Sequence, residues 1–316
     1  MGRWHARELA RAGGTLVAVA DPDPHAAASL AGGRAAPFPT LSALLEATSV
    51  DVIHICAPTD GHVELVQEAL AAGCHVLVEK PLAPDAEATR RLLEAAARER
   101  RLLCPVHQYV FQPGVLRASQ VLARLGSPVQ LDAIACSAGA GGASAGEVDR
   151  VALDIAPHPL AVLQRLLPRG LGDVTWNVDR PRPGELRAHG RAGRTGVSVV
   201  VSMSGRPPRN ELRVVCEGGT LELDFFHGFG YLERGGASRG YKALRPFVSS
   251  TLRAATAAAN LGRRAARAEP AYPGLRTLIE RFYTAARTGS QGPISAQETL
   301  AVALARDELA ASALRR

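Results

Sequence analysis

The first third of the chain alternates between short apolar runs and helix-like stretches, and this alternation restricts the fold more than any other feature. Apolar runs at 16–20, 52–56, 75–78 and 102–106 are separated by helical patterns beginning near residues 24, 41, 61 and 84. Apolar runs of this kind are typical of strands buried on both faces. Repeated β-α-β units predict a parallel sheet with helices on both faces, joined by right-handed crossovers. We assign residues 1–110 to this domain.

The pattern changes after about residue 125. Strand-like segments at 129–136, 173–178, 196–203 and 212–216 follow without regular helices between them, and Gly218-Gly219 resembles the loop of a hairpin. Residues 111–316 are therefore expected to form an α+β domain with an open, mainly antiparallel sheet. The Gly-, Ala- and Ser-rich stretch 137–146 predicts a flexible loop, and the Ala- and Arg-rich stretch 251–267 favours a solvated helix over a membrane-surface helix.

Composition excludes several classes of protein. The five cysteines, at 56, 74, 104, 136 and 216, form no CxxC pair, which argues against a disulfide framework or a metal site and favours the cytoplasm. The net charge is +7, but with only 7 Phe, 5 Tyr and 2 Trp the chain has few stacking platforms, so we expect no nucleic-acid partner. No apolar run reaches the length needed to cross a bilayer, and the start lacks a signal peptide, so we expect no membrane partner.

The start of the chain resembles half of a dinucleotide-binding unit. A helix pattern begins at Gly2 and Arg3, and Asp21 ends the next apolar run. In such units the last glycine of GxGxxG opens a helix, and an acid about 20 residues later binds the ribose hydroxyls. Asp21 as a simple helix cap is an equally good interpretation. The first strand and two glycines would precede Met1, which we interpret as an internal methionine of a longer, N-terminally truncated chain.

Two predicted strand ends carry polar residues of the types that bind ligands or take part in catalysis. One apolar run ends at Ala57-Pro58-Thr59 and the next at Glu79-Lys80. The carboxyl ends of parallel strands form the ligand-binding edge of such sheets. Of the 37 Lys and Arg residues only two are lysine, so Lys80 is a candidate for a role that needs a titratable amine. A structural ion pair with Glu79 is the alternative.

Three motifs carry a resemblance to a known family: Ala57-Pro-Thr-x-x-His62, the run from Ala72 to Glu79-Lys80-Pro81, and Asp154-Ile-Ala-Pro-His158. Together they resemble the Gfo/Idh/MocA family of NAD(P)-dependent oxidoreductases along essentially the whole chain. The resemblance implies a Rossmann-type domain and a second domain whose open sheet often forms an oligomer interface, so we expect a homo-oligomer.

The resemblance also implies roles for residues. His158 would act as the acid/base, while Lys80 and Asp154 would orient or polarise a hydroxyl, and imidazole titrates near working pH. A capping or core role for Asp154 and His158 is the alternative, and because of Pro159 we expect regular helix to start only near 156 or 157. The residues expected to bind the cofactor are Gly2, Arg3, Asp21, Ala57, Pro58, Thr59, His62, Glu79, Lys80 and Gln108.

The sequence signal is less specific for two of these cofactor residues. His62 fits equally well as a surface helix residue. Gln108 occupies the place of a family Asn, next to Val110 where the family often has Arg, which weakens the assignment there.

The expected function is transfer of a hydride between NAD and a secondary hydroxyl or keto group of a sugar, inositol or nucleotide-sugar. Asp21 favours NAD over NADP, because a carboxylate repels a 2′-phosphate, but NADP is possible. Two alternatives stay open: an NADPH-dependent reductase of C=C or C=N bonds, and a non-catalytic dinucleotide-binding regulatory homologue.

Overall fold

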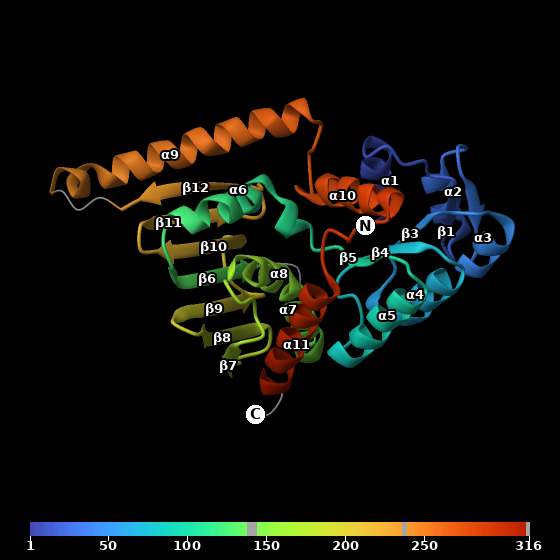
Figure 1. The fold of residues 1–316 in the computed structure, drawn as a ribbon, viewed down its shortest axis with the longest axis horizontal. Coiled ribbons are helices and arrows are strands. Elements are labelled where there is room, and N and C mark those ends of the chain that lie inside the picture. The colour runs from blue at the N-terminus through green and yellow to red at the C-terminus, as the bar shows by residue number, and fades with distance from the viewer. Residues whose placement is uncertain (138–143, 236–238, 314–316) are drawn as a thin grey trace. The chain divides into compact units, whose positions relative to one another are not determined.

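A computed structural model describes residues 1–137, 144–235 and 239–313. Two compact units interleave along the chain (Figure 1). The first unit comprises Met1–Val106 together with Leu275–Ala303, and the second comprises His107–Gly274 together with Leu304–Arg316. The ranges 1–110 and 111–316 expected from sequence differ from these units because residues 275–303 belong with the N-terminal part.

The first unit contains two parallel sheets. Strands β1 (Ala18–Ala20) and β2 (Ala36–Phe38) pair with each other, and β3 (Val52–Ile55), β4 (His75–Val78) and β5 (Leu103–Pro105) form the second sheet. In the doubly wound order, one further strand lies between the positions of β1 and β3. Among the described residues β1 and β3 do not pair, so the expected single sheet is interrupted there.

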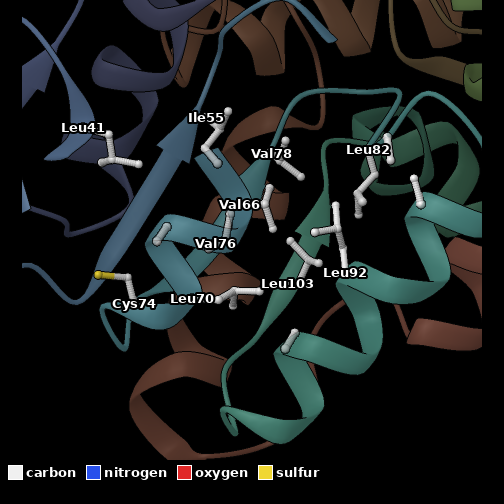
Figure 2. Packing of buried hydrophobic residues seen from close by; sticks show 14 residues of the cluster. Leu41, Ile55, Val66, Leu70, Cys74, Val76, Val78, Leu82, Leu92 and Leu103 are labelled. Carbon is white, nitrogen blue, oxygen red and sulfur yellow. The ribbon is translucent and has the colours of Figure 1, made fainter. Parts of the chain in front are cut away.

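The helices of this unit lie close to where the sequence predicts them. They are α1 (Gly2–Arg11), α2 (Pro24–Ala31), α3 (Leu41–Ala47), α4 (His62–Ala71) and α5 (Ala86–Arg98). Local signals set their ends: the Asp23 and Asp85 side chains accept hydrogen bonds from first-turn amides, and Gly32 ends α2 at a φ of 58°. The apolar core of this unit includes Val76 and Val78 of β4 and Val66 of α4, all fully buried (Figure 2).

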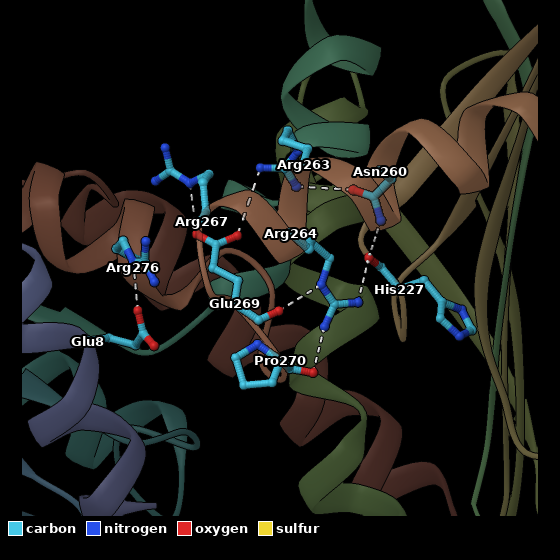
Figure 3. Close-up of polar contacts among 9 residues, drawn as sticks. All are labelled: Glu8, His227, Asn260, Arg263, Arg264, Arg267, Glu269, Pro270 and Arg276. Carbon is cyan, nitrogen blue, oxygen red and sulfur yellow. Dashed lines mark hydrogen bonds and ion pairs between the residues drawn. The ribbon is translucent and has the colours of Figure 1, made fainter.

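Helix α10 (Leu275–Thr288) belongs to the first unit although it lies far along the sequence. Its Leu278, Ile279 and Phe282 side chains are fully buried. Arg276 Nε lies 2.6 Å from the Glu8 carboxylate of α1, and both side chains are buried (Figure 3). Apolar burial and a buried ion pair therefore join α10 to α1.

The second unit is built on one seven-stranded sheet with the order β12-β11-β10-β6-β9-β8-β7. All neighbours are antiparallel except β6 and β9, so the expected fold class of a Rossmann-type domain plus an open, mainly antiparallel sheet is confirmed. The strands are β6 (Pro128–Cys136), β7 (Val174–Asp179), β8 (Glu185–Ala192), β9 (Thr195–Ser202), β10 (Arg209–Cys216), β11 (Gly219–Asp224) and β12 (Phe229–Arg234).

Helices α6 (Pro113–Val121), α7 (Ala145–Ile155) and α8 (Pro157–Leu166) pack on strands of this sheet (Figure 1). Alternate residues of β9, such as Val197 and Val199, are buried, as expected for a sheet with one covered face. Helix α9 (Arg239–Ala266) runs beside β12, and α11 (Ala296–Ala313) contributes residues to both units.

Three details differ from the sequence-based expectation. The hairpin between β10 and β11 turns at Glu217-Gly218, one residue earlier than expected, because Gly219 already pairs with Cys216. Helix α7 already lies between β6 and α8, whereas regular helix was expected only from about residue 156, and α9 begins before residue 251. Residues 138–143 of the predicted flexible loop lie outside the described residues.

Candidate functional site

The carboxyl ends of β3 and β4 lie next to each other, because these strands pair in parallel with Ile55 opposite Val78. Ala57, Pro58 and Thr59 follow β3, and Glu79 and Lys80 follow β4. The structure thus brings together five of the predicted cofactor residues at one sheet edge.

His62 holds these two strand ends together. Its Nε2 lies 2.9 Å from the Ala57 carbonyl oxygen, and its Nδ1 lies 2.9 Å from the Pro81 carbonyl oxygen. The side chain is buried, which rules out the alternative of a surface helix residue. Both partners are backbone carbonyl oxygens, one on the segment after β3 and one on the segment after β4. His62 therefore positions backbone, and its ring nitrogens are engaged there.

Glu79 turns toward α1. Its Oε1 lies 3.1 Å from His5 Nε2, and its Oε2 accepts a hydrogen bond from the Lys80 amide. His5 Nδ1 lies 2.9 Å from His54 Nδ1 on β3, and His54 Nε2 lies 3.0 Å from the Tyr283 hydroxyl on α10. One chain of hydrogen bonds thus connects α1, β3, the end of β4 and α10, and it fixes the backbone from which Lys80 projects.

The titration of this cluster is strongly perturbed. Burial by itself lowers the pKa of His5, but hydrogen bonds to Cys56 and Glu79 outweigh burial and raise it to about 9. Burial and the neighbouring His5 charge lower the pKa of His54 well below its usual range. The cluster therefore holds a protonated His5 beside a neutral His54 at neutral pH.

The expected ribose- and phosphate-binding features lie in the first unit. Helix α1 begins at Gly2, and no side chain caps its N-terminus. The first amides of such a helix are unsatisfied and favour an anion such as a pyrophosphate. Asp21 follows β1, and its Oδ1 accepts a hydrogen bond from the Asp23 amide. Asp21 thus shapes the entry to α2, as the cap interpretation expects, while Asp23 is the N-cap residue. Arg3 is exposed in the first turn of α1.

Asp154, His158 and Gln108 belong to the second unit. Asp154 lies in the last turn of α7 and His158 in the first turn of α8, so the expectation that regular helix starts only after Asp154 is wrong. The break falls at Ala156, because the proline at 157 is tolerated only in a first helical turn. Asp154 Oδ1 lies 3.5 Å from an Arg306 guanidinium nitrogen. Gln108 is buried.

An aromatic stack holds the imidazole of His158. The Tyr109 ring lies parallel to it, with centroids 4.4 Å apart and an angle of 18° between the planes. Phe225 stacks on Tyr109 with centroids 5.1 Å apart, and Asn210 Nδ2 donates a hydrogen bond of 2.7 Å to the Tyr109 hydroxyl. The arrangement restricts the orientation of the His158 imidazole, a group that suits acid/base chemistry.

The sequence motifs indicate no role for His5, Tyr109 or Tyr283, and they indicate only packing for His54. His54 interrupts an apolar strand, and a buried polar ring needs partners, so it was a usable signal. Nothing local in the sequence indicates that those partners are at positions 5 and 283. Within the described residues no group of three or more His, Cys, Asp or Glu side chains is arranged to hold a metal ion.

The chain is similar to known oxidoreductases. Residues 1–107 match the model of an oxidoreductase family with an NAD-binding Rossmann fold, the Gfo/Idh/MocA family. Inositol 2-dehydrogenase of Rhizobium meliloti (strain 1021) is 37% identical over 98 residues, which cover 31% of this chain and 30% of that protein. Inositol 2-dehydrogenase of Streptomyces avermitilis is 29% identical over 256 residues, covering 75% of this chain and 73% of that protein.

The fold comparison covers nearly the whole chain. The structure of UDP-N-acetylglucosamine 3-dehydrogenase from Acidithiobacillus ferrooxidans is similar with a TM-score of 0.74 and 22% identity, covering 98% of this chain and 93% of that chain. At this identity the likeness shows the fold alone. The N-terminal third of the chain therefore matches the Gfo/Idh/MocA family of NAD-binding oxidoreductases, and the family motifs lie at the ends of β3 and β4.

Proposed function

We propose that this protein is an NAD-dependent dehydrogenase that interconverts a secondary hydroxyl and a keto group on a sugar, inositol or nucleotide-sugar. The observation that carries this proposal is the edge formed by the ends of β3 and β4, where Lys80 follows a strand fixed by the buried Glu79 and His62 contacts. The relatives named inositol 2-dehydrogenase and UDP-N-acetylglucosamine 3-dehydrogenase support the substrate class.

The residues present fit a dinucleotide. The uncapped start of α1 at Gly2 and Arg3 suits a pyrophosphate, and the Asp21 carboxylate suits ribose hydroxyls and favours NAD over NADP. The proposed nicotinamide-side contacts come from Ala57, Pro58, Thr59, Glu79, Lys80 and Gln108. The cofactor, when bound, supplies the hydride acceptor, whereas the protein supplies position and charge.

The chain's own residues would handle the proton. Oxidation of a carbinol requires removal of the hydroxyl proton, and His158 is the proposed base, oriented by its stack on Tyr109. Lys80, as a cation, would stabilise the negative charge that develops on the substrate oxygen. Asp154 would orient the substrate hydroxyl, with Arg306 nearby to balance its charge.

We also propose that the protein acts in the cytoplasm as a homo-oligomer without a nucleic-acid partner. The five cysteines are all free, as suits a reducing compartment. Ile134 on β6 is 37% exposed on a sheet strand, which supports a covering partner. No helix in the described part of the chain is long and apolar enough to cross a membrane.

The two lysines give a matched test of the function. NADH binding is measured by nicotinamide fluorescence, and turnover is measured with NAD and a panel of polyols and nucleotide-sugars. Lys80→Ala is expected to lower kcat at least 100-fold while NADH still binds, because charge stabilisation is removed. Lys242→Ala, an exposed position on α9, is expected to match the wild type.

Two results would contradict the proposal. The first is a protein that binds neither NADH nor NADPH. The second is a Lys80→Ala variant that turns over a substrate as fast as the wild type.

A further inference from the structure

Helix α9 exposes large apolar side chains. Leu244, Phe247, Val248 and Leu261 are 60%, 73%, 46% and 68% exposed, respectively. Single exposed apolar residues are ordinary, but four along one helix of a water-exposed unit form a patch of the kind that marks an interaction surface. This surface belongs to the second unit and lies outside the proposed catalytic residues.

The exposed residues follow a heptad pattern. Steps of three and four residues place six side chains in one row along the helix, which we call the α9 seam. All six are exposed. In order, the α9 seam contains Leu244, Phe247, Thr251, Ala254, Ala258 and Leu261. It spans 18 residues, or about 27 Å at 1.5 Å per residue. Alternating steps of three and four residues are the signature of a helix that packs along another helix.

The charged side of α9 points the other way, toward its own unit. Arg253 lies 3.8 Å from Glu211 of β10, and Arg245 pairs with Glu233 of β12. Near the end of the helix, Arg263 lies 3.8 Å from Glu269, and Arg264 donates to the backbone carbonyls of Glu269 and Pro270 (Figure 3).

The buried Asn260 completes this inner side, since its Nδ2 donates to the His227 carbonyl oxygen (Figure 3). Hydrogen bonds and ion pairs therefore fix the rotation of α9, with the seam outward.

The absence of charge in the α9 seam indicates which kind of partner it binds. It carries no charged side chain, and four of the helix arginines are engaged on the inner side, so the seam suits neither an anionic lipid surface nor an acidic peptide. Copies of a chain with a net charge of +7 repel one another, and an uncharged contact keeps that repulsion small. We propose that the α9 seam is an interface between two copies of this chain, which pack α9 against α9.

The sizes of the seam residues favour an antiparallel pair. In an antiparallel pair, the seam of one copy runs in the reverse order of the seam of the other copy. Leu244 then faces Leu261, Phe247 faces Ala258, and Thr251 faces Ala254. Each layer holds either two leucines or one larger and one smaller residue, which fills space evenly. A parallel pair would place Phe247 on Phe247 beside layers of two alanines, leaving voids.

The test measures the mass of the full-length protein in solution by light scattering. Phe247→Glu places a charge in the seam and is expected to halve the mass. It should leave the far-ultraviolet circular dichroism spectrum unchanged, because the side chain is 73% exposed in the single chain and does not hold its fold together. Ala259→Glu is the matched control, since this exposed position lies beside the seam and is expected to keep the wild-type mass.

A second variant tests the direction of packing. A chain carrying both Phe247→Cys and Ala258→Cys is expected to form a covalent dimer on mild oxidation. Phe247→Cys alone, which would face itself only in a parallel pair, is expected to form none, and so is Ala259→Cys. The proposal is overturned by a monomeric wild type, by equal masses for the wild type and Phe247→Glu, or by a monomer that binds phosphatidylglycerol vesicles through this helix. A mass that falls from four copies to two supports it, since a separate sheet interface then remains.

Discussion

The parallel stack of Tyr109 on His158 is the most specific side-chain arrangement in the second unit. Its centroid distance of 4.4 Å is within the range for stacked rings, and Asn210 anchors the far end of the tyrosine. Burial raises the pKa of Tyr109 above its usual value, so the hydroxyl stays neutral, and its oxygen accepts the hydrogen bond from Asn210 Nδ2. Tyr109 is therefore a positioning residue for the proposed base.

Substitution of Tyr109 tests that role. A stacked pair is worth about 0.5–1.5 kcal/mol, so Tyr109→Leu is expected to lower kcat by about 3- to 10-fold without changing the dissociation constant of NADH. Tyr109→Phe keeps the ring and is expected to retain most of the activity. Tyr231→Phe on β12 serves as a control with no expected effect. Equal kcat values for Tyr109→Leu and the wild type would show that the stack does not position His158.

At the scale of secondary-structure elements, the His5–Glu79–His54–Tyr283 cluster joins one strand, the end of another and two helices of the first unit. Its two histidines respond to pH in opposite ways. The pKa of His5 is raised to about 9 in the folded state, so its contribution to stability is complete below about 6.5 and is lost as the pH rises toward 9. The pKa of His54 is lowered, so its contribution is lost as the pH falls below about 6.5.

Stability is therefore expected to be greatest near neutral pH and to fall on both sides. The alkaline loss from His5 is at most ~3 kcal/mol, since each unit of pKa difference is worth about 1.4 kcal/mol. His5→Gln should flatten the decrease in melting temperature between pH 7 and 9, whereas His25→Gln, at an exposed position of α2, should leave it unchanged. The assignment fails if the wild type and His5→Gln lose stability in parallel over this range.

At the scale of the whole molecule, residues 275–303 belong with the N-terminal unit although 168 residues of the other unit lie between them in sequence. Without this segment, the Glu8 carboxylate, which is 4% exposed, loses Arg276, and the apolar surface covered by Leu278, Ile279 and Phe282 becomes exposed. Breaking a buried ion pair costs about 3–5 kcal/mol, a large part of the stability of an ordinary domain.

A chain of residues 1–110 alone is accordingly expected to show no cooperative unfolding transition in urea. The same chain joined to residues 275–303 through a flexible linker is expected to regain one. Circular dichroism monitors both titrations. A cooperative transition of equal midpoint in the two chains would show that the N-terminal range is an autonomous domain.

What the sequence by itself determined was local. Apolar runs, capping residues and glycines at turns located β3, β4, α3 and most of α4 and α5, because strand burial and helix ends depend on neighbours a few residues apart. The strand-end motifs at Ala57–Thr59 and Glu79–Lys80 were equally visible, since parallel strands end at one edge.

Only the tertiary structure decided which distant groups meet. It paired His5 with Glu79, Tyr283 with His54 and Tyr109 with His158, and it turned the arginine side of α9 inward. Each of these contacts depends on how elements pack, and a side chain's periodicity along its own element carries no information about the residue that will face it.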